Sequence, residues 1–270
     1  MNIDAVNAYG LVLLGCGKMG SALLQGWLAE GVAPPSVYVI EPNPSNWLRG
    51  TGVTIGAVLP PSPAVAILAV KPQMMGDALP LIRVLGGGNT LIVSIAAGTP
   101  IKTFESAFGR DTPIVRAMPN TPAAVCKGIT ALIGNAASGE DHLLLAETLL
   151  GAVGQVVRLK SEDQMDAVTA VSGSGPAYVF HLIETMATAG VAEGLSEELA
   201  MTLAKATVAG AGALAEQAAE DPGQLRVNVT SPAGTTAAAL EVLMDNTRGF
   251  PVLIPESVSA AANRSRELRG

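Results

Sequence analysis

The residues best suited to bind a ligand form a glycine-rich run near the start of the chain. Residues 15–20 read G-C-G-K-M-G, which matches the pattern G-x-G-x-x-G of dinucleotide-binding loops. In such loops Gly15 would permit the tight turn, Gly17 would let a pyrophosphate approach the backbone, and Gly20 would let helix and strand pack closely. Free N–H groups at the start of the following helix would attract the anion. The run predicts a cofactor-binding loop that consists of Gly15, Cys16, Gly17, Lys18, Met19 and Gly20.

A carboxylate follows where such a loop meets the ribose of the nucleotide. Glu41 ends the predicted strand 37–41, about twenty residues after Gly20. An acidic side chain there would accept a hydrogen bond from the 2′-hydroxyl of NAD and repel the 2′-phosphate of NADP. Arg49 is close enough in sequence to bind that phosphate instead. The residues leave the choice between NADH and NADPH open, although Glu41 favours NADH.

Three further segments follow predicted strands, at the edge where α/β sheets bind their ligands. They are residues 69–72 (A-V-K-P), 96–98 (A-A-G) and 118–122 (M-P-N-T-P). Lys71 directly follows a buried strand, so it either contacts the cofactor or remains a surface lysine. These segments are candidate parts of the same nucleotide site.

Two segments rich in serine, threonine and glycine precede predicted helices in the second half. The later one, residues 228–236, reads N-V-T-S-P-A-G-T-T, and its hydroxyls and free N–H groups suit a small anion such as a carboxylate. Capping of the helix by Thr235 explains the same pattern. For residues 172–178 (S-G-S-G-P-A-Y), we interpret Ser172 and Ser174 as helix caps.

Other kinds of chemistry have little support. His142 and His181 lie in separate predicted helices, which argues against a histidine relay. Cys16 and Cys126 have no metal-ligating neighbour at useful spacing, so we expect no metal site and no disulfide framework.

The composition excludes several classes of protein. The net charge is −7, with 49% hydrophobic and 14% charged residues. The negative charge argues against a nucleic-acid partner, and the apolar content argues against intrinsic disorder. The longest apolar runs, such as residues 65–70 and 91–97, are too short to span a membrane. Residues 1–9 do not resemble a signal peptide, so we expect a cytoplasmic protein.

The elements that must position these residues fall into two groups. Up to residue 160 short apolar runs alternate with helical patterns, which predicts an α/β domain with a mostly parallel sheet. From residue 161 the pattern is helical only, with few large side chains, so this domain is expected to complete its core by dimerising. The predicted strands are 10–15, 37–41, 53–55, 65–70, 91–95, 114–117, 129–133 and 156–159. The predicted helices are 18–30, 74–85, 101–108, 139–150, 161–170, 175–194, 196–220, 222–228, 235–244 and 255–268.

Seven sequence blocks together resemble the pyrroline-5-carboxylate reductase family. In order from Gly15 to Leu240 they are GCGKMG, AVKP, SIAAG, RAMPNTPA, DAVTAVSGSGPAYVF, DPGQL and TSPAGTTAAAL. The resemblance implies a Rossmann-like dinucleotide-binding domain over residues 1–160. It also implies an all-α dimerisation and substrate-binding domain over residues 161–270. The activity that it implies is NAD(P)H-dependent reduction of the C=N bond of 1-pyrroline-5-carboxylate to L-proline, the last step of proline biosynthesis.

The resemblance also implies roles for individual residues. Beside the glycine-rich loop and Glu41, the cofactor contacts would be Ala69, Val70, Lys71, Pro72, Ala97 and Asn228. The substrate contacts would be Glu162, Gly234, Thr235 and Thr236, with the Thr236 hydroxyl nearest the ring nitrogen as the catalytic group. Two positions depart from the family: Ala233 stands where glycine is usual, and Glu41 stands where a small polar residue and a preference for NADPH are usual.

Two alternatives stay open at this point. A reductase of the six-membered cyclic imino acid would use the same residue types, because spacing does not fix the pocket volume to one methylene. A nucleotide-binding oligomer that senses redox state without turnover is the other alternative, although such a protein has no need of the G-T-T segment.

Overall fold

The computed structural model describes residues 3–268. By its internal contacts the chain divides into two compact units. The N-terminal unit comprises residues 1–173 together with 262–270, and the helical unit comprises residues 174–261. The N-terminal unit thus continues beyond residue 160, the predicted end of the α/β domain, and also includes the last described residues of the chain.

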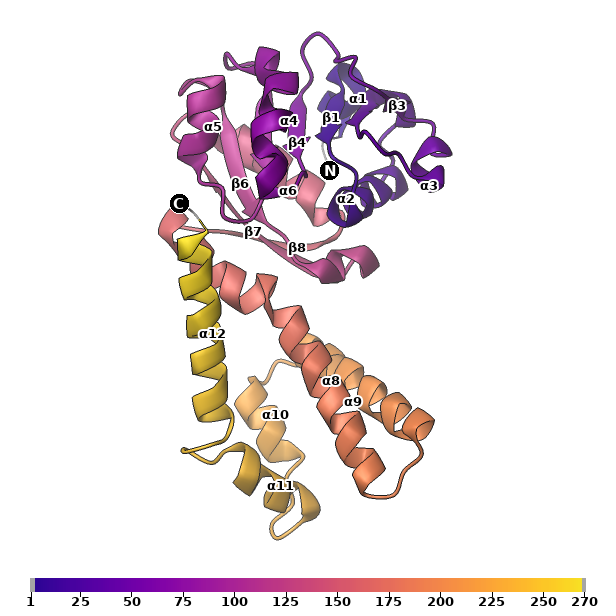
Figure 1. Cartoon of the computed structure of the whole chain (residues 1–270), viewed down its shortest axis with the longest axis vertical. Helices are drawn as coiled ribbons and strands as arrows, with labels where there is room; N and C mark the ends of the chain where they lie inside the picture. Colours follow the sequence, from indigo (N-terminus) through magenta and orange to yellow (C-terminus); the bar gives the residue numbers. More distant parts are fainter. Residues whose placement is uncertain (1–2, 269–270) are drawn as a thin grey trace. The chain divides into compact units, whose positions relative to one another are not determined.

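The described part of the N-terminal unit is built on one eight-stranded sheet in the order β3-β2-β1-β4-β5-β6-β7-β8 (Figure 1). All neighbouring strands are parallel except β6 and β7. The order reverses between β1 and β4, which is where doubly wound folds form a ligand crevice. The strands are β1 (Leu11–Leu14), β2 (Val37–Ile40), β3 (Thr54–Ile55), β4 (Val65–Leu68), β5 (Leu91–Ser94), β6 (Ile114–Met118), β7 (Gly128–Gly134) and β8 (Gly154–Arg158).

The central strands are apolar throughout because both faces of the sheet are covered. Leu11 and Leu13 point into one hydrophobic core with α2 (Lys18–Ala29) and α6 (Glu140–Gly151). The alternate residues Val12 and Leu14 point into a second core with α4 (Met75–Ile82) and α5 (Ile101–Phe108). In the first core the indole of Trp27 donates a hydrogen bond of 2.7 Å to the Leu149 carbonyl, which ties α2 to α6.

Smaller elements complete this unit. They are α1 (Asp4–Tyr9), α3 (Asn46–Arg49), α7 (Met165–Val168), the 3₁₀ turns Pro34–Ser36, Pro72–Met74, Arg83–Leu85, Thr121–Val125 and Glu162–Gln164, and the π-helical turn Thr169–Gly173.

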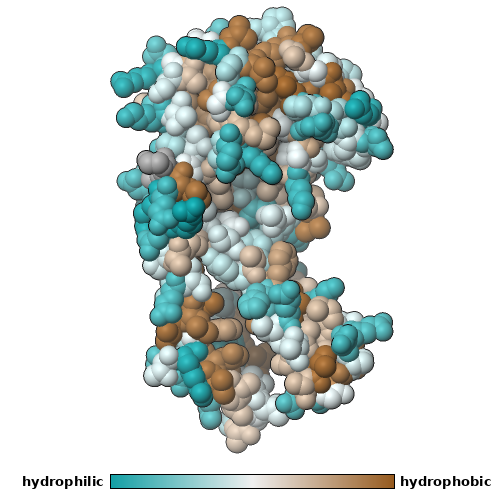
Figure 2. All heavy atoms as spheres, viewed as in Figure 1, coloured by the Kyte–Doolittle hydropathy of each residue, from teal (hydrophilic) through white to brown (hydrophobic). Residues whose placement is uncertain are grey.

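The helical unit contains α8 (Gly175–Ala192), α9 (Glu197–Gln217), α10 (Pro222–Asn228), α11 (Thr235–Leu243) and most of α12 (Phe250–Glu267). Ser196 caps α9 and Asp221 caps α10 through side-chain oxygens that accept backbone N–H bonds. The buried core of this unit is small: Ala187, Ala200 and Ala204 form its hydrophobic cluster. Large apolar side chains remain at the surface, and Figure 2 shows brown patches over these helices.

The predicted fold class is confirmed: a mostly parallel α/β domain precedes an all-helical domain. Each of the eight predicted strands has its counterpart in the sheet. The predicted start of the last helix at Pro255 is wrong, because α12 begins at Phe250 and Pro255 lies inside it. Pro251 occupies the first turn instead, where proline is tolerated. The two short helices α1 and α3 were not predicted.

Among the described residues, no helix combines the length and apolar character that a bilayer crossing needs.

Candidate functional site: a crevice at the strand ends

A crevice of about 510 Å³ opens at the carboxyl ends of four parallel strands. Each strand contributes the residues that directly follow it or end it. The lining residues are Gly17, Lys18 and Met19 after β1, Ala69, Val70, Lys71 and Pro72 after β4, Ile95, Ala96 and Ala97 after β5, and Met118 and Pro119 at the end of β6. The crevice therefore lies where the sheet order reverses.

The glycines of the loop at residues 15–20 have separate steric roles. Gly15 has a φ of +89°, in the region that favours glycine. A Cβ on Gly20 would lie 2.4 Å from the Gly15 carbonyl oxygen, so only glycine fits there without a shift of the loop. A Cβ on Gly17 would meet nothing within 4 Å. Gly17 therefore leaves open space beside the first turn of α2, where free N–H groups favour an anion.

Glu41 is directly attached to this loop. Its Oε2 accepts a hydrogen bond of 2.9 Å from the Cys16 N–H, and its Oε1 accepts one of 3.0 Å from the Asn43 N–H. Burial raises the pKa of the Cys16 thiol, a hydrogen bond with Ser21 opposes this, and the Glu41 carboxylate raises it further. Cys16 thus stays protonated near neutral pH and is a poor nucleophile.

Glu162 contacts two groups within the N-terminal unit. Its Oε1 accepts a hydrogen bond of 2.6 Å from Nη1 of Arg116, which forms an ion pair, and another of 2.9 Å from the N–H of Ile101, the first residue of α5. Arg116 lies in β6 with only 2% of its side chain exposed. The arginine was not singled out from the sequence, although a charged residue in the apolar run I-V-R-A-M was a usable signal.

The predicted anion-binding segment forms the start of α11 in the helical unit. Gly234 is the residue before this helix, and no side chain caps it. The interpretation of Thr235 as the cap is therefore wrong, because Thr235 is the first helical residue. Within the described chain, the hydroxyls of Thr235 and Thr236 have no hydrogen-bond partner. Ala233 has a φ of +56°, a strained value for a residue with a Cβ.

The caps predicted before α8 are not formed. Ser172 donates its hydroxyl to the Val168 carbonyl at 3.0 Å, and Ser174 makes no side-chain cap bond. Neither serine caps α8 because the π-helical turn precedes this helix directly, so the backbone is already helical at these positions.

The crevice brings together most, but not all, of the predicted cofactor residues. Gly17, Lys18, Met19, residues 69–72 and Ala97 line it, whereas Gly15, Cys16 and Gly20 shape the turn behind it. Glu41 holds that turn from outside the lining. Asn228 lies at the end of α10 in the helical unit, where its side chain accepts a hydrogen bond of 2.8 Å from Gln224. Ala96, Met118 and Pro119, which belong to the segments named as candidate parts of this site, also line the crevice. Ile95 lines it too, although it was predicted only as the end of a strand.

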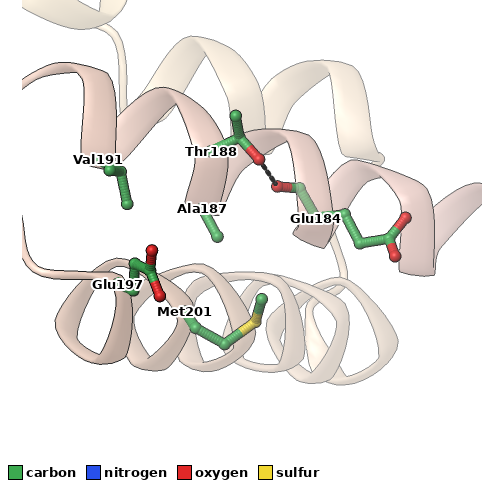
Figure 3. A pocket seen from close by; sticks show the side chains of 6 residues that line it. All are labelled: Glu184, Ala187, Thr188, Val191, Glu197 and Met201. Atoms are coloured by element: carbon green, nitrogen blue, oxygen red, sulfur yellow. Dashed lines mark hydrogen bonds between the residues drawn. The ribbon is translucent and has the colours of Figure 1, made fainter.

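The helical unit has a second, open groove of about 530 Å³ between α8 and α9. Figure 3 shows Ala187 and Val191 of α8 and Met201 of α9 on its walls, with Glu184 and Glu197 beside them. The Thr188 hydroxyl donates to the backbone carbonyl of Glu184 at 3.0 Å and is thus satisfied within its helix. Within residues 3–268, no cluster of three or more His, Cys, Asp or Glu side chains could hold a metal ion.

Two family profiles match different parts of the chain. One, described as pyrroline-5-carboxylate reductase dimerisation, matches residues 162–268. The other, described as NADP oxidoreductase coenzyme F420-dependent, matches residues 10–98, which include the glycine-rich loop. The first of these implies that the protein self-associates.

Relatives of known type match the chain over almost its whole length. Pyrroline-5-carboxylate reductase of Synechocystis is 41% identical over 268 residues, which cover 96% of this chain and 97% of that protein. The enzyme of Pseudomonas aeruginosa is 39% identical over 264 residues and 96% of both chains.

Solved structures agree. A pyrroline-5-carboxylate reductase from Coxiella burnetii superposes with a TM-score of 0.91 at 33% identity, covering 97% of this chain and 99% of that one. Plasmodium falciparum pyrroline carboxylate reductase, solved with NADP bound, superposes with a TM-score of 0.84 at 29% identity, covering 98% and 99%. The chain therefore belongs to the pyrroline-5-carboxylate reductase family.

Proposed function

We propose that this protein performs its family's reaction with the residues described above. It is an NAD(P)H-dependent pyrroline-5-carboxylate reductase, which reduces the C=N bond of 1-pyrroline-5-carboxylate to give proline. The observation that carries the proposal is the crevice at four strand ends, with a glycine-rich loop whose Gly17 leaves room for a pyrophosphate. The loop N–H groups suit the charge of that pyrophosphate.

The cofactor side of the proposal uses the N-terminal unit. Residues 15–20 hold the pyrophosphate, while Val70, Lys71 and Ala97 line the nicotinamide half of the crevice. Bound NAD(P)H supplies the hydride for the imine carbon. Because a protonated imine is already electrophilic, the protein's main task is to hold the reactants in position.

The substrate side of the proposal uses the start of α11. The N–H groups of Thr235 and Thr236, which no side chain caps, suit the substrate carboxylate, whereas the Gly234 N–H already donates to the Ser231 carbonyl at 3.0 Å. The Thr236 side chain is half-buried and its hydroxyl is free of partners within the described residues, so it is available to hydrogen-bond the ring nitrogen.

Self-association, in this proposal, uses the C-terminal helices. The buried core of the helical unit is small, so it contributes little to the stability of this unit. Large apolar side chains of α8 and α9 are exposed, among them Phe180, Leu199 and Leu203. Burial of these side chains against a second copy would stabilise both. A cytoplasmic location fits the two free cysteines.

The reaction is tested by the loss of reduced-nicotinamide absorbance with purified protein. The five-membered imine, its six-membered homologue and no imine are compared, each with NADH and with NADPH. Turnover of the five-membered substrate is the expected result. Faster turnover of the six-membered ring, or binding of nucleotide without turnover of either, would refute the proposal.

The role of Thr236 is tested by substitution. Thr236→Ala should lower kcat/KM, because a lost or unpaired hydrogen bond would raise the corresponding activation free energy by about 1–3 kcal/mol. Thr236→Ser, which keeps the hydroxyl, should restore most of the activity. Unchanged kinetics in the alanine variant would remove Thr236 from the site.

A further inference from the structure

Glu41 is a charged group fixed at the entrance of the nucleotide loop. Both of its carboxylate oxygens accept backbone N–H bonds, from Cys16 at 2.9 Å and from Asn43 at 3.0 Å. The half-buried side chain therefore has one defined position, immediately after β2 and against the first turn of the loop. In a doubly wound fold this is where the ribose of the adenosine half lies.

The Glu41 carboxylate still has free hydrogen-bond acceptor sites and a negative charge with which to meet a ligand. A carboxylate has about four acceptor sites, and the two backbone bonds use two of them. Within the described residues, Glu41 forms no ion pair, so no basic side chain is in direct contact with its carboxylate. A ribose 2′-hydroxyl can donate to such a group, whereas a 2′-phosphate brings a second anion close to it.

The nearby basic residue is not arranged as a phosphate site. Arg49 ends the short helix α3, and its exposed side chain forms no hydrogen bond or ion pair within the described chain. Nothing in the structure holds its guanidinium toward the loop, whereas Glu41 is held there by two bonds.

We propose that Glu41 makes this reductase select NADH over NADPH, by binding the 2′-hydroxyl and repelling the 2′-phosphate. This inference rests on the proposed function and assigns the cofactor that the same site uses. The bond to Cys16 gives Glu41 a second task, since it also fixes the loop that carries the pyrophosphate.

The test measures two quantities for each cofactor: kcat/KM with the five-membered imine, and the dissociation constants of NAD⁺ and NADP⁺ without imine. The wild type should favour NADH over NADPH by about tenfold or more. Glu41→Gln keeps an oxygen for the Cys16 N–H but removes the charge, and should raise NADP⁺ affinity by about tenfold relative to NAD⁺. Glu41→Ser should do the same.

Two further variants separate this selection from other effects. Glu30→Gln removes one exposed negative charge at the end of α2 and should leave the cofactor ratio unchanged. Arg49→Ala should also leave the ratio unchanged. A wild type that uses NADPH as well as NADH, or a ratio that stays constant in both Glu41 variants, would overturn the proposal. A loss of NADPH use in Arg49→Ala would overturn it as well.

The binding measurement keeps this inference distinct from the proposed function. If neither imine is reduced, the proposed function fails, while the dissociation constants of NAD⁺ and NADP⁺ still decide the role of Glu41.

Discussion

Two glycines of the nucleotide loop should fail in different ways when each is replaced by alanine. The added Cβ at Gly20 would lie 2.4 Å from the Gly15 carbonyl oxygen, whereas the added Cβ at Gly17 would meet no atom within 4 Å. The first substitution therefore acts on the fold, and the second acts on the space that a bound pyrophosphate would occupy. Comparing the two variants therefore separates glycine that the packing of the loop requires from glycine that the bound ligand requires.

The magnitudes follow from the contacts. At Gly20 the loop cannot simply move away, because the Gly15 N–H is held by the Ile40 carbonyl at 2.9 Å. Overpacking of this kind costs about 1–3 kcal/mol, and the better helix propensity of alanine in α2 returns up to about 1 kcal/mol. Gly20→Ala should thus lower the free energy of unfolding by about 1–2 kcal/mol.

At Gly17 two small effects oppose each other. Alanine is a poorer residue than glycine before a helix, but it also reduces the conformational entropy of the unfolded chain. The free energy of unfolding should change by less than about 1 kcal/mol, whereas the dissociation constant for the dinucleotide should rise by about tenfold or more.

Urea unfolding of the free protein and nucleotide titration measure the two effects independently. Both variants and the wild type are compared at one protein concentration, because self-association makes stability concentration-dependent. The reasoning is refuted if Gly17→Ala unfolds as easily as Gly20→Ala, or if Gly17→Ala binds the dinucleotide with wild-type affinity.

Two further predictions concern stability. Arg116→Met leaves the Glu162 carboxylate without its cation and should lower the free energy of unfolding, measured in urea, by about 2–3 kcal/mol. This loss is smaller than for a fully buried pair because Glu162 is partly exposed. A loss as small as that of the exposed control Arg49→Met would contradict the prediction. Ala233→Gly relieves a φ of +56° and should be neutral or stabilising by up to about 1 kcal/mol. The control Ala213→Gly, at an exposed position in the C-terminal third of α9, should cost about 1 kcal/mol. Equal thermal-shift losses in the two glycine variants would show that Ala233 is not strained.

The sheet and its crevice could be predicted because their signals are local. A strand that is buried on both faces reads as a continuous apolar run, and Val65–Leu68 in β4 is such a run. Parallel strands place their carboxyl ends at one edge, so the segments that follow them meet without further information. The residues after β4, including Lys71, were found in this way.

Long-range pairs gave no comparable signal. Ser265 near the end of α12 donates to the buried Asp166 at 2.7 Å, across 99 residues of sequence. Both residues belong to the N-terminal unit, so this bond is one of the contacts that join the last turns of α12 to that unit. Nothing in the spacing of a serine and an aspartate so far apart indicates that they meet. The start of α12 was mispredicted for a local reason, since two prolines four residues apart each suit a first turn.

Glu162, which the family resemblance assigns to ligand contact, makes two bonds that hold the walls of the crevice. Its carboxylate oxygen receives the Ile101 N–H, so it fixes the point where the loop after β5 enters α5. Ala97, which lines the crevice, lies in that loop, only four residues before Ile101. Arg116 holds the same oxygen from β6, the strand that ends at the crevice residue Met118. The ion pair therefore positions two walls of the crevice from behind, because a shift of Glu162 would move both the loop and the strand. Loss of Arg116 should accordingly weaken nucleotide binding as well as stability, an effect that a pair serving the fold alone would not have.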